Sequence, residues 1–88
     1  IVHQVAAAVA VGCPVIVKPA TNTPLSCFRI VNIFHEAGLP KAWCQALVIA
    51  DNKLATKLVT DARVAFLSFI GSAKVGWWLR SQLAPGTR

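Results

Sequence analysis

The stretch Val15-Ile16-Val17-Lys18-Pro19-Ala20-Thr21-Asn22-Thr23-Pro24 decides the fold of this chain. An apolar, β-branched run ends at a single lysine, and a short loop leads to Thr23-Pro24, a pair typical of a helix start. The pattern predicts a strand, a loop and a helix, with Lys18 at the carboxyl end of the strand. Ligands of open α/β sheets bind at that end.

Lys18 has two interpretations at this point. A lysine is a compact cation with three donors, which suits ribose hydroxyls or a phosphate. A lysine also marks many strand ends simply because it is exposed to water there. Both interpretations stay open on this stretch alone.

Helix and strand patterns alternate along the rest of the chain. Apolar residues spaced three apart, beginning at Leu25 and Phe28, predict the buried stripe of the helix after the loop. Short links between alternating elements predict an α/β fold with a parallel sheet and right-handed crossovers, in the order α-β-α-β-α-β-α. The expected elements are a helix over 1–11, a strand over Val15–Lys18, a helix from Pro24 to a stop at Gly38, a strand over Trp43–Ala50, a short helix capped by Asp51, a strand over Val64–Phe69 and a helix from Ser72 to about Leu83.

Composition points to a part of something larger. Of the 88 residues, 56% are hydrophobic and 14% are charged, whereas typical domains are roughly 45–50% apolar and about 25% charged. A short chain cannot bury so much apolar surface by itself. We therefore expect a piece of a larger protein, or a domain that buries one face against a partner.

Charge and hydropathy exclude two classes of partner. The net charge is +6, but the basic residues are scattered singly, without a basic run, so a nucleic-acid partner is not expected. The apolar run Val5–Val17 is interrupted by Gly12 and Pro14 and is too short to span a bilayer, so no membrane partner is expected.

Neither a metal site nor a catalytic site is indicated. The cysteines Cys13, Cys27 and Cys44 show no metal-ligand spacing and lie in apolar stretches, so we expect buried free thiols. Free thiols suggest a reducing compartment, the cytoplasm. The few acidic residues lie at the ends of the expected elements, where capping explains them, and no catalytic triad or Cys-His pair follows from the spacing.

Two strand-to-helix junctions are candidate binding sites, Lys18–Thr21 and Gly71-Ser72. Gly71 permits close backbone approach, the helix start offers free N–H groups, and Ser72 adds a hydroxyl. Gly76, in the first turn, keeps that surface low, so the junction suits a phosphate. An ordinary N-cap has the same sequence pattern. The residues alone therefore indicate a nucleotide-binding-like α/β unit.

Three segments carry a resemblance to a known family. Gly12-Cys13-Pro14-Val15-Ile16-Val17-Lys18-Pro19-Ala20-Thr21-Asn22-Thr23-Pro24-Leu25-Ser26 resembles the cofactor-domain signature of the aldehyde dehydrogenase superfamily. Glu36-Ala37-Gly38-Leu39-Pro40 and Phe69-Ile70-Gly71-Ser72-Ala73-Lys74-Val75-Gly76 resemble later segments of that domain, in the family's order and spacing. The resemblance implies a Rossmann-like parallel sheet with flanking helices, and it makes residues 1–88 a partial NAD(P)-binding domain.

The resemblance also implies roles for the first junction. Lys18 matches the lysine that bonds the adenosine ribose hydroxyls, and Pro19 and Ala20 match the backbone beside it. Thr21 stands where many members have a glutamate that grips the ribose and selects NAD. Without that carboxylate NADP becomes admissible, so the cofactor is NAD or NADP.

At the second junction, Gly71-Ser72 matches the family's pyrophosphate-binding turn. Val75 matches an apolar wall of the adenine slot, and Gly76 closes the motif. There are three departures from the family's pattern. Ala50-Asp51-Asn52 stands where the family often has a Gly-containing turn after the second strand, Ile70 replaces the usual threonine, and Trp77-Trp78 is an unusually bulky pair.

The function implied is the cofactor-binding segment of an NAD(P)-dependent aldehyde dehydrogenase. The family's nucleophile, general base and oxyanion donor fall outside these residues, so we expect the segment to be inactive alone. Its expected partners are the dinucleotide, the remainder of the enzyme with its catalytic domain, and further copies in a homo-oligomer. The alternatives are a CoA-acylating aldehyde dehydrogenase and a non-catalytic structural or binding module.

Overall fold

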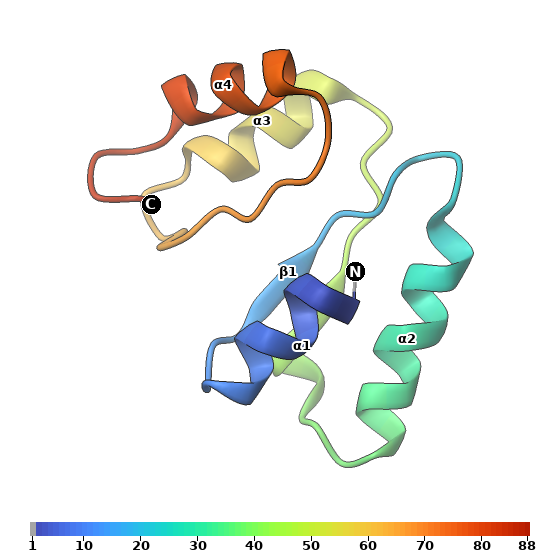
Figure 1. Ribbon diagram of the computed structural model, residues 1–88. Coiled ribbons are helices and arrows are strands. Elements are labelled where there is room, and N and C mark those ends of the chain that lie inside the picture. Colours follow the sequence, from blue (N-terminus) through green and yellow to red (C-terminus); the bar gives the residue numbers. More distant parts are fainter. Residues whose placement is uncertain (1) are drawn as a thin grey trace. The chain divides into compact units, whose positions relative to one another are not determined.

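A computed structural model describes residues 2–88, so the start of the predicted first helix at Ile1 lies outside the described residues. The chain divides into two compact units, of which the first ends at Ala50 and the second covers Asp51–Arg88. Figure 1 shows the elements of each unit, and the fold class is α/β, as predicted. The elements are α1 (Val2–Ala10), β1 (Val15–Val17), α2 (Pro24–Glu36), the 3-10 turn η1 (Lys41–Trp43), β2 (Cys44–Ala46), α3 (Asn52–Thr60) and α4 (Ala73–Gln82).

The sheet of the first unit is a parallel pair, β1 and β2, joined through α2. The register places Val15 opposite Cys44 and Val17 opposite Ala46. One further bond follows, in which the Leu47 N–H donates to the Val17 carbonyl oxygen at 2.8 Å. The pairing then stops, because Pro19 has no N–H with which to extend the ladder. The second strand is therefore shorter than the predicted Trp43–Ala50.

Helix α2 begins and ends close to the predicted positions. Pro24 occupies the first helical turn, but the Thr23 side chain makes no capping hydrogen bond. The Thr23 backbone instead closes a turn, its N–H donating to the Ala20 carbonyl oxygen at 3.1 Å. At the other end Gly38 has a φ of 108°, a conformation that glycine adopts without strain, and it ends the helix.

The core of the first unit lies between α1, α2 and the two strands. It consists of Val5, Val17, Cys27, Val31 and Cys44, each at most 8% exposed. Helix α2 thus contributes Cys27 and Val31 to the core, one turn apart.

The predicted stripe on α2 was partly wrong. Leu25 is 79% exposed and Phe28 is 37% exposed. Val31, a member of the predicted stripe, is buried as expected, and Cys27, outside the stripe, is buried one turn before it. Many larger apolar side chains remain exposed, in line with the apolar excess of the composition.

The second unit consists of α3, an extended segment and α4. Asp51 caps α3 as predicted, its carboxylate accepting from the Lys53 N–H at 2.9 Å. Among residues 2–88, no helix is long and apolar enough to cross a bilayer.

The prediction of a third strand over Val64–Phe69 was wrong. In the part of the chain that the structure describes, these residues lie outside the sheet. In the second unit the backbone of this segment pairs with Arg88. The Leu67 N–H donates to the Arg88 carbonyl oxygen at 2.6 Å, and the Arg88 N–H donates to the Ala65 carbonyl oxygen at 3.0 Å. These two bonds bracket Phe66 as in a parallel pair. A single bracketed residue is not a ladder, so the element order becomes α-β-α-β-α-α.

Candidate functional site

The first junction follows directly from the end of β1. Pro19 is buried, while Lys18, Ala20 and Thr21 are exposed. The turn closed by the Thr23 N–H folds this loop back toward the start of α2. Within residues 2–88 the Lys18 ammonium takes part in no ion pair, so the charge is free to meet an anionic or hydroxyl-bearing ligand.

The second junction is the start of α4. Ser72 is the N-cap, with its Oγ accepting from the Val75 N–H at 3.3 Å and its carbonyl oxygen accepting from the Gly76 N–H at 3.0 Å. This is the N-cap that the sequence predicts. A serine hydroxyl that accepts one bond still has its own hydrogen to donate. The cap is therefore compatible with a second role toward a ligand.

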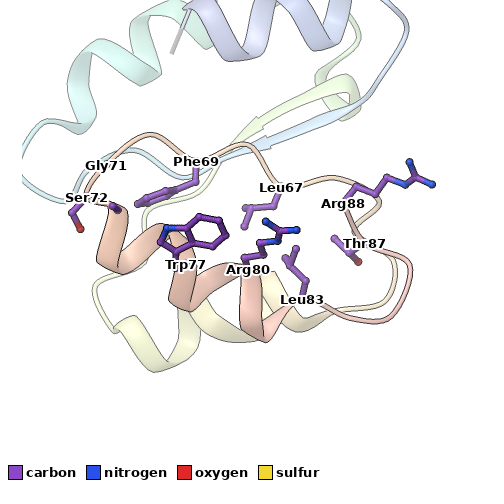
Figure 2. Close-up of a pocket in the computed structure, with 11 residues that line it drawn as sticks. Leu67, Phe69, Gly71, Ser72, Trp77, Arg80, Leu83, Thr87 and Arg88 are labelled. Carbon is purple, nitrogen blue, oxygen red and sulfur yellow. The ribbon is translucent and has the colours of Figure 1, made fainter.

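A groove of about 780 Å³ runs along α4 in the second unit. Figure 2 shows the Phe69 ring beside the Gly71-Ser72 turn, and Arg80 between Trp77 and Leu83. The groove brings together three of the predicted residues and several others. Its lining residues are Leu67, Phe69, Gly71, Ser72, Ala73, Gly76, Trp77, Arg80, Leu83, Thr87 and Arg88.

The structure places the remaining predicted residues elsewhere. Val75 is 44% exposed and does not line the groove. Lys18, Pro19, Ala20 and Thr21 belong to the first unit. The geometry of each junction is thus defined within its own unit.

Sequence reasoning missed Arg80 as part of this groove. Ser72, Gly76 and Arg80 are spaced four residues apart and so share one face of α4. The guanidinium carbon of Arg80 lies 5.3 Å from the centroid of the Trp77 ring, within the range of a cation–π contact. The spacing of four was the signal that could have identified Arg80.

Charge in the groove favours an anion. Its lining includes Arg80 and Arg88 but no aspartate or glutamate. The start of α4 adds N–H groups that lack partners within the helix, together with the positive end of its dipole. Gly71 and Gly76 line the groove near those groups and add no side chain of their own. This combination fits a phosphate-bearing ligand.

The thiols do not form a reactive site. Cys27 and Cys44 are almost fully buried, and burial raises the pKa of both thiols, with the neighbouring Cys44 adding to the effect at Cys27. A thiol with a raised pKa stays protonated and is a poor nucleophile. Cys13 is exposed, so the expectation that it is buried was wrong. Among residues 2–88 no cluster of His, Cys, Asp and Glu is suited to a metal ion.

Comparison with known proteins gives consistent matches over almost the whole chain. Residues 1–87 match the model of the aldehyde dehydrogenase family. The non-phosphorylating aspartate-semialdehyde dehydrogenase of Halomonas elongata is 39% identical over 84 residues, which are 96% of this chain and 17% of that protein.

Two eukaryotic enzymes match this chain with similar sequence identity and coverage. The succinate-semialdehyde dehydrogenase [NADP(+)] of Saccharomyces cerevisiae is 37% identical over 84 residues, covering 93% of this chain and 17% of that protein. The mitochondrial succinate-semialdehyde dehydrogenase of Mus musculus is 37% identical over 79 residues, covering 86% of this chain and 15% of that protein. The chain thus spans a small part of the length of each relative.

Proposed function

Because the chain belongs to the aldehyde dehydrogenase family, we propose that it is the cofactor-binding segment of an NAD(P)-dependent oxidoreductase that acts on an aldehyde. The observation that carries this proposal is the groove along α4. It gathers Gly71, Ser72 and Gly76 at a helix start, with arginines and no acidic residue in its lining. A dinucleotide pyrophosphate matches that arrangement in charge and size.

The residues of this chain have binding roles in the proposal. The Lys18 ammonium donates to ribose hydroxyls, and the Ser72 hydroxyl and the first N–H groups of α4 donate to the pyrophosphate. Val75 forms an apolar wall for the adenine. Pro19 and Ala20 shape the backbone beside Lys18. When bound, the nicotinamide of NAD(P) accepts a hydride, and the protein around it binds and orients.

Thr21 governs the choice between NAD and NADP in this proposal. Its side chain is exposed on the loop after Lys18 and has no negative charge to repel a 2′-phosphate. The yeast relative is named for NADP(+), which supports testing both cofactors. Semialdehydes, named for several relatives, are the first substrates to test.

We also propose that the protein acts in the cytoplasm as a homo-oligomer. The free thiols support a reducing compartment. Exposed apolar side chains on α2, among them Leu25 and Ile33, support a surface that other protein covers.

The test of the function uses the intact protein. Calorimetric titration with NAD and with NADP measures binding, and absorbance at the reduced nicotinamide band measures turnover of a semialdehyde. We expect binding of at least one dinucleotide and aldehyde-dependent reduction. Addition of CoA shows whether the acyl group passes to water or to CoA. Absence of binding by both dinucleotides would contradict the proposal.

A further inference from the structure

The Phe69 ring lies over both glycines of the second junction. A Cβ atom added at Gly71 would lie 2.5 Å from the Phe69 Cζ and 3.1 Å from its Cε1. A Cβ atom added at Gly76 would lie 3.4 Å from the Phe69 Cδ1. Figure 2 shows the ring beside the Gly71-Ser72 turn, on the groove. The space that the two glycines leave open is therefore filled by one side chain of the same chain.

Backbone conformation does not explain the glycine at either position. Gly12, Gly38 and Gly86 have positive φ values, which favour glycine. Gly71 and Gly76 are not among the residues with positive φ. A positive φ therefore does not call for glycine at these two positions, and at Gly71 it is the Phe69 ring that leaves no space for a side chain.

The ring also faces the groove. Phe69 is 41% exposed, and its open side lines the same groove as Ser72 and Arg80. The extended segment that carries Phe69 is held in the second unit through Leu67, whose N–H donates to the Arg88 carbonyl oxygen. The ring thus stands between an anchored segment and the turn that begins α4.

We propose that Phe69 is a positioning residue of the dinucleotide site, whose ring packs on Gly71 and Gly76 and thereby sets the place of the Gly71-Ser72 turn. This inference rests on the proposed function. In this view Gly71 is small because the ring needs its space, whereas a direct role would make Gly71 small because the cofactor approaches it.

A cycle of variants in the intact protein separates the two explanations. The variants are Gly71→Ala, Phe69→Leu and the double variant, and the measurements are the dissociation constant for NAD or NADP and the melting temperature. Ala62→Ser is the control for one added atom, because Ala62 is exposed in the same unit and does not line the groove. If Phe69→Leu does not fold, Phe69→Met replaces it, since an unbranched side chain fills irregular space.

We expect Gly71→Ala to weaken dinucleotide binding about tenfold, because the new methyl group displaces the ring and the turn. Phe69→Leu should weaken binding about threefold, because the shorter side chain no longer fixes the turn, and Ala62→Ser should leave the dissociation constant unchanged. The double variant should bind within about threefold of Phe69→Leu, since the shorter side chain makes room for the methyl group.

Other results overturn the inference. Gly71→Ala with unchanged affinity, or a double variant as weak as Gly71→Ala alone, would mean that the ring does not act through this turn. Recovery of the melting temperature without recovery of affinity would assign Phe69 a structural role only. Wild type that binds neither dinucleotide overturns the proposed function, and this inference with it, whereas the preceding results overturn the inference alone.

Discussion

The Nε2 atom of His35 lies 2.8 Å from the carbonyl oxygen of Cys44 and ties the end of α2 to the start of β2. A carbonyl oxygen only accepts, so this ring nitrogen carries the hydrogen and donates it. Cys44 is fully buried and pairs with Val15 in the sheet. The bond therefore fixes a helix against a strand at the centre of the first unit.

We expect His35→Ala to lower the free energy of unfolding by about 1 kcal/mol, the usual value of one partly buried hydrogen bond. Denaturant unfolding of the variant and of wild type measures the change. His3→Ala is the control, because His3 is exposed and the change should stay within about 0.5 kcal/mol. Equal losses for the two variants would contradict the role given to His35.

The second prediction concerns the pair Asp61 and Arg63. The Asp61 carboxylate accepts from the Arg63 side chain at 2.8 and 3.0 Å and from the Arg63 backbone N–H at 2.9 Å. These side-chain and backbone bonds lower the pKa of Asp61 from 3.8 to about 2. Arg63→Ala should raise the pKa only part of the way to its usual value, because residue 63 keeps its backbone N–H, and carbon-13 NMR of the carboxyl group measures the change.

The sign of the pH effect follows from the lowered pKa. The paired carboxylate contributes stability that is fully present above pH 3.8 and is lost as the pH falls through about 2. Both side chains reach solvent, so the contribution is small and screened by salt. An Asp61 pKa that stays near 2 in Arg63→Ala would mean that another group lowers it.

Local signals predicted much of this fold. Gly38, Asp51 and Ser72 each mark a helix end where expected, because caps and positive φ depend on neighbouring residues. The strand at 64–69 was mispredicted for the opposite reason. A strand exists only if another strand lies beside it, and the β-branched and aromatic content of the segment does not specify that partner.

The candidate groove was predicted only in part, because only some of its contacts join residues that are neighbours in the sequence. The Gly71-Ser72 junction is local, and the sequence indicated it. Trp77 and Arg80 enter the groove through their place on one face of α4 and through a contact between side chains. Phe69 enters it by packing on glycines that follow it in the chain. Such contacts depend on three-dimensional packing, which the motif pattern does not describe.

The third prediction is that the 88-residue chain alone forms no NAD(P)H from an aldehyde. Cys27 and Cys44 are buried, and burial raises the pKa of both thiols, so neither is a ready nucleophile. The assay is aldehyde-dependent absorbance of the reduced nicotinamide, with the intact protein as positive control. The prediction is wrong if the segment alone turns over an aldehyde and that turnover is abolished by Cys13→Ala, Cys27→Ala or Cys44→Ala.

The fourth prediction concerns Lys18 and Ser72, the two proposed anchors of the dinucleotide, in the intact protein. Lys18→Ala should weaken dinucleotide binding by about 10- to 150-fold, since a charge-assisted bond contributes ~1.5–3 kcal/mol. Ser72→Ala should weaken dinucleotide binding less than Lys18→Ala does, because in the proposal the first N–H groups of α4 still donate to the pyrophosphate. Lys41→Ala, at an exposed lysine of η1, is the control for loss of a charge. Unchanged dissociation constants in Lys18→Ala would mean that Lys18 is only an exposed strand end.

The last prediction is that Thr21→Glu shifts cofactor preference in the intact protein toward NAD. The exposed Thr21 side chain follows Lys18 by three residues on the loop after β1, where the proposal places the adenosine ribose. A carboxylate there accepts bonds from ribose hydroxyls but repels a 2′-phosphate, so NADP loses more affinity than NAD.

Thr21→Gln is the matched control, because glutamine has nearly the same size as glutamate without the charge. The measurement is the ratio of the two dissociation constants in wild type and both variants. We expect the ratio to move in Thr21→Glu well beyond its value in Thr21→Gln, and to move less at high salt, since salt screens an exposed charge. Equal ratios in the two variants would remove Thr21 from the choice of cofactor.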